Sequence, residues 1–131
     1  MNLTELMIGD WVSYKGKPHK VNGIEDNHLY LKNSNGCIIM ALPDEITPVP
    51  ITGEILKKNA FQYTICREYR YKNDLVDVTL CTPKPGLFWI AIKNGDSTHT
   101  TDFHYLESCI GYVHEFQHGL IACKLDKSIE L

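Results

Sequence analysis

The chain has 131 residues, of which 44% are hydrophobic and 22% are charged, proportions that exclude a disordered or fibrous protein. Its formal net charge of −3 is spread over both halves, so neither half offers the basic face that phosphate binding needs, and we expect no nucleic acid among its partners. No stretch approaches the roughly 20 apolar residues of a membrane span, and the N-terminus lacks a secretory-signal pattern, which favours a protein of the cytoplasm with no membrane association.

Residues 1–51 have the pattern of short strands separated by tight turns. Strands are predicted at 11–14, 19–25, 28–31, 37–41 and 46–51, with turns at Lys15–Pro18, Glu25–Asn27 and Asn33–Gly36 and a bulge at Gly23. So many short strands in so few residues predict a small SH3-like β-barrel or a strongly bent sheet.

Three aromatic residues of these strands are candidates for an exposed binding groove. They are Trp11, Tyr14 and Tyr30. Large aromatic side chains in strands also pack in cores, and this alternative stays open at the level of the sequence.

Residues 52–131 predict a different arrangement. Thr52 is a plausible N-cap for a short helix over 53–59, and strands are predicted at 61–71, 75–81 and 87–92, followed by a polar loop at 94–101 and a long helix from Asp102 to about Cys123. Together they form a β-β-β-α unit with the helix packed on an antiparallel sheet. The whole chain is therefore expected to be α+β, with subdomains at 1–51 and 52–131 that either stand apart or form one compact domain.

The expected helix contains the sequence His114-Glu115-Phe116-Gln117-His118, which matches HExxH. Histidines at i and i+4 lie on one helix face, where His114 and His118 can bind one Zn²⁺, and Glu115 can activate a zinc-bound water as the general base. The motif predicts a zinc-dependent hydrolase, provided that a third ligand completes the site.

That third ligand is missing from the usual position. Ile121 and Lys124 stand where the extended zinc-protease pattern has glycine and histidine. The remaining candidates are Cys123, Asp126 and Glu130 after the motif and His99 and His104 before it. Without a completed site, the alternative is that both histidines are ordinary helix residues at the rim of the helix–sheet interface.

The five cysteines are an odd number without CxxC spacing, which indicates reduced and mostly buried thiols. No serine-hydrolase elbow, P-loop or dinucleotide fingerprint is present.

Four segments together resemble a group of small proteins of Bacteroidales genomes, prophages and mobile elements for which no activity is known. These segments are Met7-Ile8-Gly9-Asp10-Trp11-Val12, the link 45–52 into 54–61, the strand ending in Trp89, and Tyr112-Val113-His114-x-x-Gln117. The resemblance implies that His114 and Gln117 belong to a shared helix, while Glu115 and His118 are incidental.

The leading expectation is therefore a non-enzymatic binding or adaptor protein without a cofactor, a phage or mobile-element accessory factor that binds a host protein or a small molecule. A homo-oligomer is one way for such a small chain to form a groove. The alternative is the zinc-dependent hydrolase centred on residues 114–118.

Overall fold

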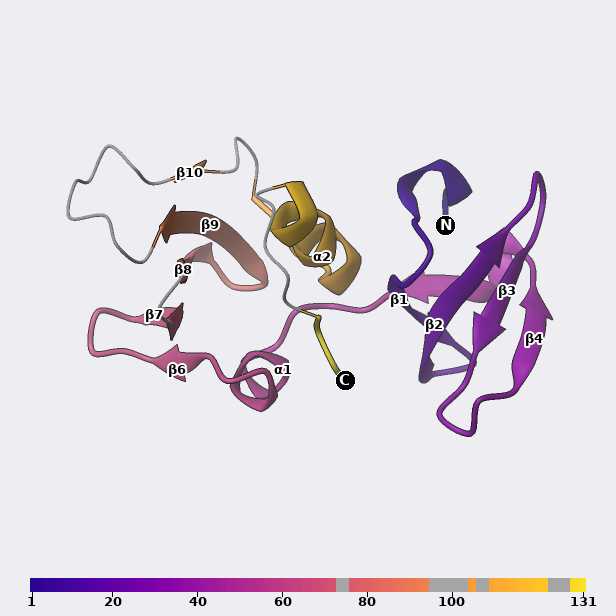
Figure 1. The fold of residues 1–131 in the computed structure, drawn as a ribbon, viewed down its shortest axis with the longest axis horizontal. Coiled ribbons are helices and arrows are strands. Elements are labelled where there is room, and N and C mark those ends of the chain that lie inside the picture. The colour runs from indigo at the N-terminus through magenta and orange to yellow at the C-terminus, as the bar shows by residue number, and fades with distance from the viewer. Residues whose placement is uncertain (73–75, 95–103, 106–108, 123–127) are drawn as a thin grey trace. The chain divides into compact units, whose positions relative to one another are not determined.

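The computed structural model describes residues 1–72, 76–94, 104–105, 109–122 and 128–131 (Figure 1). The chain divides into two compact units, which are treated separately below. Unit 1 comprises residues 1–50 and 112–114, and unit 2 comprises residues 51–111 and 115–131. Within these described residues, each unit contains one antiparallel sheet of five strands, and one helix lies near the C-terminus. The predicted α+β class is confirmed.

The sheet of unit 1 has the strand order β4-β3-β2-β1-β5. Its strands are β1 (Trp11–Tyr14), β2 (Lys17–Ile24), β3 (Leu29–Lys32), β4 (Ile38–Ala41) and β5 (Ile46–Pro48), with 3-10 turns η1 (Leu3–Glu5) and η2 (Pro43–Glu45). Because β4 and β5 are the two edges, these strands form an open sheet and not a closed barrel.

Local backbone chemistry explains the first hairpin and the bulge of this sheet. Lys15 and Gly16 both have positive φ, 50° and 75°, which is typical of a two-residue turn between antiparallel strands. The turn is thus shorter than predicted, and β2 already begins at Lys17. The predicted bulge is present, since the β2–β3 register shifts between Val21 and Gly23.

Alternate side chains of the strands form the core of unit 1. The buried apolar residues are Leu6, Val12, Val21, Leu29, Leu31, Ala41 and Ile46. A late segment of the chain joins this unit by backbone pairing: Tyr112 forms an antiparallel bridge with Pro50, and the Val113 N–H donates to the Val49 carbonyl at 2.8 Å.

The sheet of unit 2 has the strand order β10-β9-β8-β7-β6. Its strands are β6 (Gln62–Tyr63), β7 (Glu68–Lys72), β8 (Val76–Lys84), β9 (Leu87–Asn94) and β10 (His104–Tyr105). Helix α1 (Gly53–Lys58) precedes the sheet, and the Thr52 hydroxyl accepts a hydrogen bond from the Ile55 N–H at 3.2 Å, as its predicted N-cap role requires. The single strand predicted over 61–71 is divided into β6 and β7 by a turn in which Arg67 has φ 60°.

The long helix predicted from Asp102 is wrong in its first half. Helix α2 spans only Val113–Ala122, and His104–Tyr105 form the strand β10 beside β9. Ile110 pairs with Phe88 through two backbone hydrogen bonds of 2.8 and 2.9 Å. The N–H and C=O groups of Ile110 therefore form hydrogen bonds with another strand, whereas in the predicted helix they would have bonded within the helix. The predicted polar loop at 94–101 lies, beyond Asn94, outside the described residues.

The core of unit 2 combines one face of the sheet with apolar side chains of both helices. Its large buried residues include Leu56, Phe61, Val78, Leu80, Phe88, Ile90, Phe116, Leu120 and Ile129. The Phe61 ring lies 5.7 Å from that of Phe116 and 5.6 Å from that of Tyr71. The buried Asn59 side chain ties the C-terminal residues to this unit, because its amide group donates to the Glu130 carbonyl at 2.7 Å and accepts from the Glu130 N–H at 2.8 Å.

Candidate functional site

Both histidines of the HExxH sequence lie on α2, but their surroundings differ. His114 is buried, with 4% of its surface exposed, and its ring is stacked with that of Tyr112 at a centroid distance of 6.0 Å. His118 is half-buried. The expectation of two similar rim histidines therefore does not hold for His114, which is packed as a core residue.

Glu115 has a structural partner at the start of α2. Its Oε1 accepts a hydrogen bond from the Gly111 N–H at 3.0 Å. A carboxylate in the first turn of a helix also interacts favourably with the positive end of the helix dipole. This arrangement is that of a helix-capping glutamate, in which the carboxylate stabilises the start of α2.

A third metal ligand is not brought to these histidines by the part of the chain that the structure describes. Among those residues, no three or more His, Cys, Asp or Glu side chains gather closely enough to hold a metal ion. Of the predicted candidates, Glu130 is exposed, His104 lies in β10, and His99, Cys123 and Asp126 fall outside the described residues.

The three aromatic residues proposed to line a groove do not share one face of the unit 1 sheet. Tyr14 packs against the core cluster, and its ring meets that of the buried His19 edge-on at 5.5 Å. Trp11 lies an odd number of positions from Tyr14 on β1, so it points to the opposite face. Tyr30 lies between the buried Leu29 and Leu31 and points to that opposite face too.

This opposite face is called the outer face below. The cross-strand register assigns to it Trp11, Ser13, Pro18, Lys20, Gly23, Tyr30, Lys32, Ile38, Met40 and Thr47. It carries no aspartate or glutamate, although residues 1–50 contain several acids, because those acids stand in turns and at strand ends. The outer face is therefore aromatic, apolar and basic.

Two lysines stand on neighbouring strands of this face. Lys20 and Lys32 are direct cross-strand partners, and like charges in such a pair destabilise a sheet. Lys20 is held partly by the neighbouring strand, since its Nζ lies 5.0 Å from the centre of the Trp11 ring. A local arrangement that costs stability is more common at functional surfaces than elsewhere.

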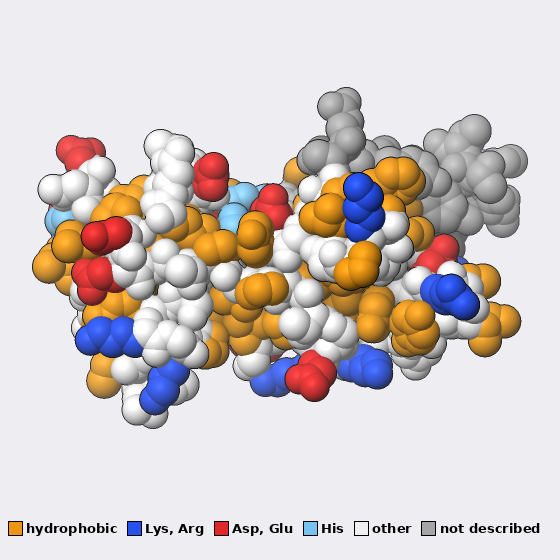
Figure 2. Space-filling model, turned by 180° about the vertical axis from the view of Figure 1, so that it is seen from behind, with side chains coloured by type: hydrophobic (Ala, Val, Ile, Leu, Met, Phe, Trp, Pro, Cys, Tyr) orange, Lys and Arg blue, Asp and Glu red, His pale blue; other side chains and the backbone are white. Residues whose placement is uncertain are grey.

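The outer face continues into an exposed apolar edge. Ile38 and Met40 of β4 are 48% and 59% exposed. They are the cross-strand partners of Lys32 and Tyr30, and no described strand pairs with the other side of β4 (Figure 1). Figure 2 shows hydrophobic side chains at the surface of unit 1. An open apolar edge is a surface to which another extended chain can pair.

Sequence reasoning found Trp11 and Tyr30 but missed Lys20, Lys32, Ile38 and Met40. The signal was present in the alternation of each strand, yet the side chains meet only once the hairpin register is known.

No protein-family model, curated protein or solved structure matches the chain. Within the described residues, no helix is long and apolar enough to span a membrane.

Proposed function

We propose that the chain is a non-enzymatic binding module of the cytoplasm that takes up an extended, acidic and partly apolar segment of a partner protein. The segment pairs with the open edge of β4, and its side chains contact the outer face of unit 1. The observation that carries the proposal is the combination of an open strand edge with an adjacent basic and aromatic face free of acidic residues.

Strand addition explains the affinity of such a complex. The outward-facing N–H and C=O groups of β4 can pair with those of an incoming strand, while pockets for alternate side chains supply specificity. Ile38 and Met40 would be covered by apolar side chains of that strand, which removes exposed apolar surface from water.

The charge of the outer face selects an acidic segment. Lys20 and Lys32 are cross-strand partners of like charge, and a carboxylate of the incoming segment can form a charged hydrogen bond with either ammonium group. Nucleic acid fits less well, because phosphate binding draws on many basic contacts, whereas this face has two lysines beside exposed Ile38 and Met40. The resemblance to prophage and mobile-element proteins favours a host protein as the partner.

The zinc-hydrolase alternative draws less support from the geometry. Glu115 accepts a hydrogen bond from the Gly111 N–H, and His114 is buried beside Tyr112. These contacts suit a helix start better than a catalytic centre.

The test is selection of peptides from a display library on the whole protein, followed by affinity measurement with synthetic copies of the enriched sequences. We expect enrichment of peptides that alternate acidic and apolar residues. In amide exchange, bound peptide should protect N–H groups of β4. Enrichment without acidic bias, or binding that leaves β4 unprotected, would refute the proposal, as would tighter binding of single-stranded oligonucleotides than of any peptide.

Two variants localise the binding. Lys32→Glu reverses a charge on the outer face. It should lower the affinity for a selected peptide by at least about tenfold, since a charged hydrogen bond contributes about 1.5–3 kcal/mol. The matched control is Lys57→Glu on α1, which makes the same charge change at an exposed position that belongs to unit 2. Equal loss in both variants would show that only net charge matters.

A further inference from the structure

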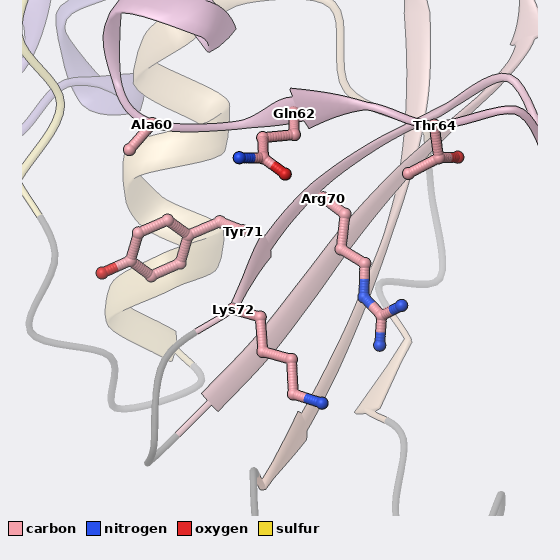
Figure 3. A pocket seen from close by; sticks show the side chains of 6 residues that line it. All are labelled: Ala60, Gln62, Thr64, Arg70, Tyr71 and Lys72. Carbon is pink, nitrogen blue, oxygen red and sulfur yellow. The ribbon is translucent and has the colours of Figure 1, made fainter.

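The β6–β7 hairpin of unit 2 borders a cavity of about 420 Å³ (Figure 3). It is lined by Ala60, Gln62, Thr64, Arg70, Tyr71 and Lys72. This volume lies within the range of pockets that bind small molecules. The cavity belongs to unit 2 alone, so it is independent of the peptide surface proposed for unit 1.

The polar lining follows from the alternation of the two strands. Gln62 and Arg70 are cross-strand partners, and Lys72 lies two positions beyond Arg70 on the same face. Figure 3 shows Arg70 and Lys72 reaching to one side of β7 while the Tyr71 ring points away from them. Thr64 is fixed at the end of the hairpin, where its N–H donates to the Glu68 carbonyl at 2.8 Å.

The Arg70 guanidinium is held by the carboxylate of Asp77 on the neighbouring strand β8. Its Nε donates to Asp77 Oδ1 at 2.9 Å, and its Nη2 donates to Asp77 Oδ2. Asp77 is 5% exposed, whereas the Arg70 side chain is 46% exposed, and the carboxylate raises the pKa of the guanidinium through this hydrogen bond and charge. A guanidinium has five N–H donors, so those not used by Asp77 remain for a ligand. Fixing the group in advance lowers the entropy lost on binding.

Two other lining groups lack a protein partner within the described residues. The Thr64 hydroxyl oxygen is buried and makes no hydrogen bond there, which is uncommon for a buried polar atom. Lys72 is exposed and forms no ion pair with a described residue. The Lys72 ammonium group can donate to an anion bound beside the Arg70 guanidinium.

We propose that this cavity binds a small organic anion through its carboxylate or phosphate group. Arg70 and Lys72 pair with the charge, the Gln62 amide donates a hydrogen bond, and Ala60 offers apolar surface to the body of the ligand. No bond is made or broken, since the site is one of binding.

The test is a titration of the whole protein followed by amide and guanidinium NMR signals. The probes are phenyl phosphate and benzoate, with benzamide as a neutral probe of similar shape and sodium chloride at matched ionic strength. We expect saturable shifts centred on residues 62–72 with one or both anionic probes, and the stronger of the two identifies the preferred group. Absence of saturable shifts with both, or equal binding of benzamide, would overturn the proposal.

Variants separate a specific site from general charge attraction. Lys72→Ala should lower the affinity for the more tightly bound anionic probe by at least about tenfold, as expected for loss of a charged hydrogen bond. The control is Lys84→Ala at the exposed end of β8, which lies outside the cavity lining and should leave affinity unchanged. Equal weakening by Lys72→Ala and Lys84→Ala would refute a built site.

Discussion

At the scale of single residues, the thiols differ in their surroundings. Burial and a hydrogen bond to Glu68, 3.5 Å from Cys81 Sγ to Glu68 Oε1, raise the pKa of Cys81. A raised pKa lowers the thiolate fraction at any given pH, and the thiolate is the reactive form. We expect iodoacetamide at mildly alkaline pH to modify Cys81 more slowly than the exposed Cys37 and Cys66, as followed by peptide mass spectrometry.

The control for this prediction is Glu68→Gln. Because burial is the larger cause of the raised pKa, this variant should accelerate modification of Cys81 only modestly. Modification of Cys81 in the native protein at the rate of Cys37 would contradict the expected difference.

Gly53 is a second residue whose role can be tested. A Cβ at this position, the first of α1, would overlap the hydroxyl group of Tyr69. Alanine normally stabilises a helix by about 1 kcal/mol relative to glycine, but overpacking costs about 1–3 kcal/mol. We therefore expect Gly53→Ala to lower the free energy of unfolding in urea, and Tyr69→Phe in the same chain to restore part of it. A more stable Gly53→Ala variant would show that Tyr69 moves aside without cost.

The aromatic candidates show what residue spacing can predict. The spacing of Trp11 and Tyr14 on one strand already places them on opposite faces, so their separation could have been read from the sequence. That Trp11 and Tyr30 share a face depends on the β2–β3 register and its shift at Gly23. A single sequence does not determine this register because several pairings bury the same apolar residues.

At the scale of elements, strands and turns were predicted better than the start of α2. The helical spacing of Leu106, Ile110 and Val113 gave the prediction, yet Ile110 is β-branched and pairs in extended form with Phe88. Partners distant in sequence decide between the two forms, and periodicity carries no information about them.

The HExxH sequence on α2 gives a prediction about metal. We expect protein purified without a histidine tag to contain no stoichiometric zinc by elemental analysis, and His118→Ala to have the same metal content. Glu115→Ala should lower stability by about 1 kcal/mol, because it removes the hydrogen bond to the Gly111 N–H at the helix start. Zinc near one equivalent per chain, lost in His118→Ala, would instead support the hydrolase.

At the scale of the whole molecule, the chain leaves unit 1 after Pro50 and contributes to it again with residues 112–114. The change from short strands to a helix near residue 51 is visible in the sequence, but the return of the chain to unit 1 is not, since Tyr112-Val113-His114 has the pattern of a helix. The backbone pairing of Tyr112 with Pro50 and of Val113 with Val49 shows how these residues join unit 1.

Val113 therefore belongs to unit 1, although it is the first residue of helix α2. Its side chain is 0% exposed, and truncation of such a residue costs about 2 kcal/mol. We expect Val113→Ala to reduce amide-exchange protection in β2 and β3 of unit 1 more than in β8 and β9 of unit 2. The control is Ile121→Ala on the same helix, where 57% of the side chain is exposed and little effect is expected in either sheet. If Val113→Ala lowered protection equally in both sheets, the two units would unfold as one cooperative structure, and the division of the chain would describe its geometry but not its stability.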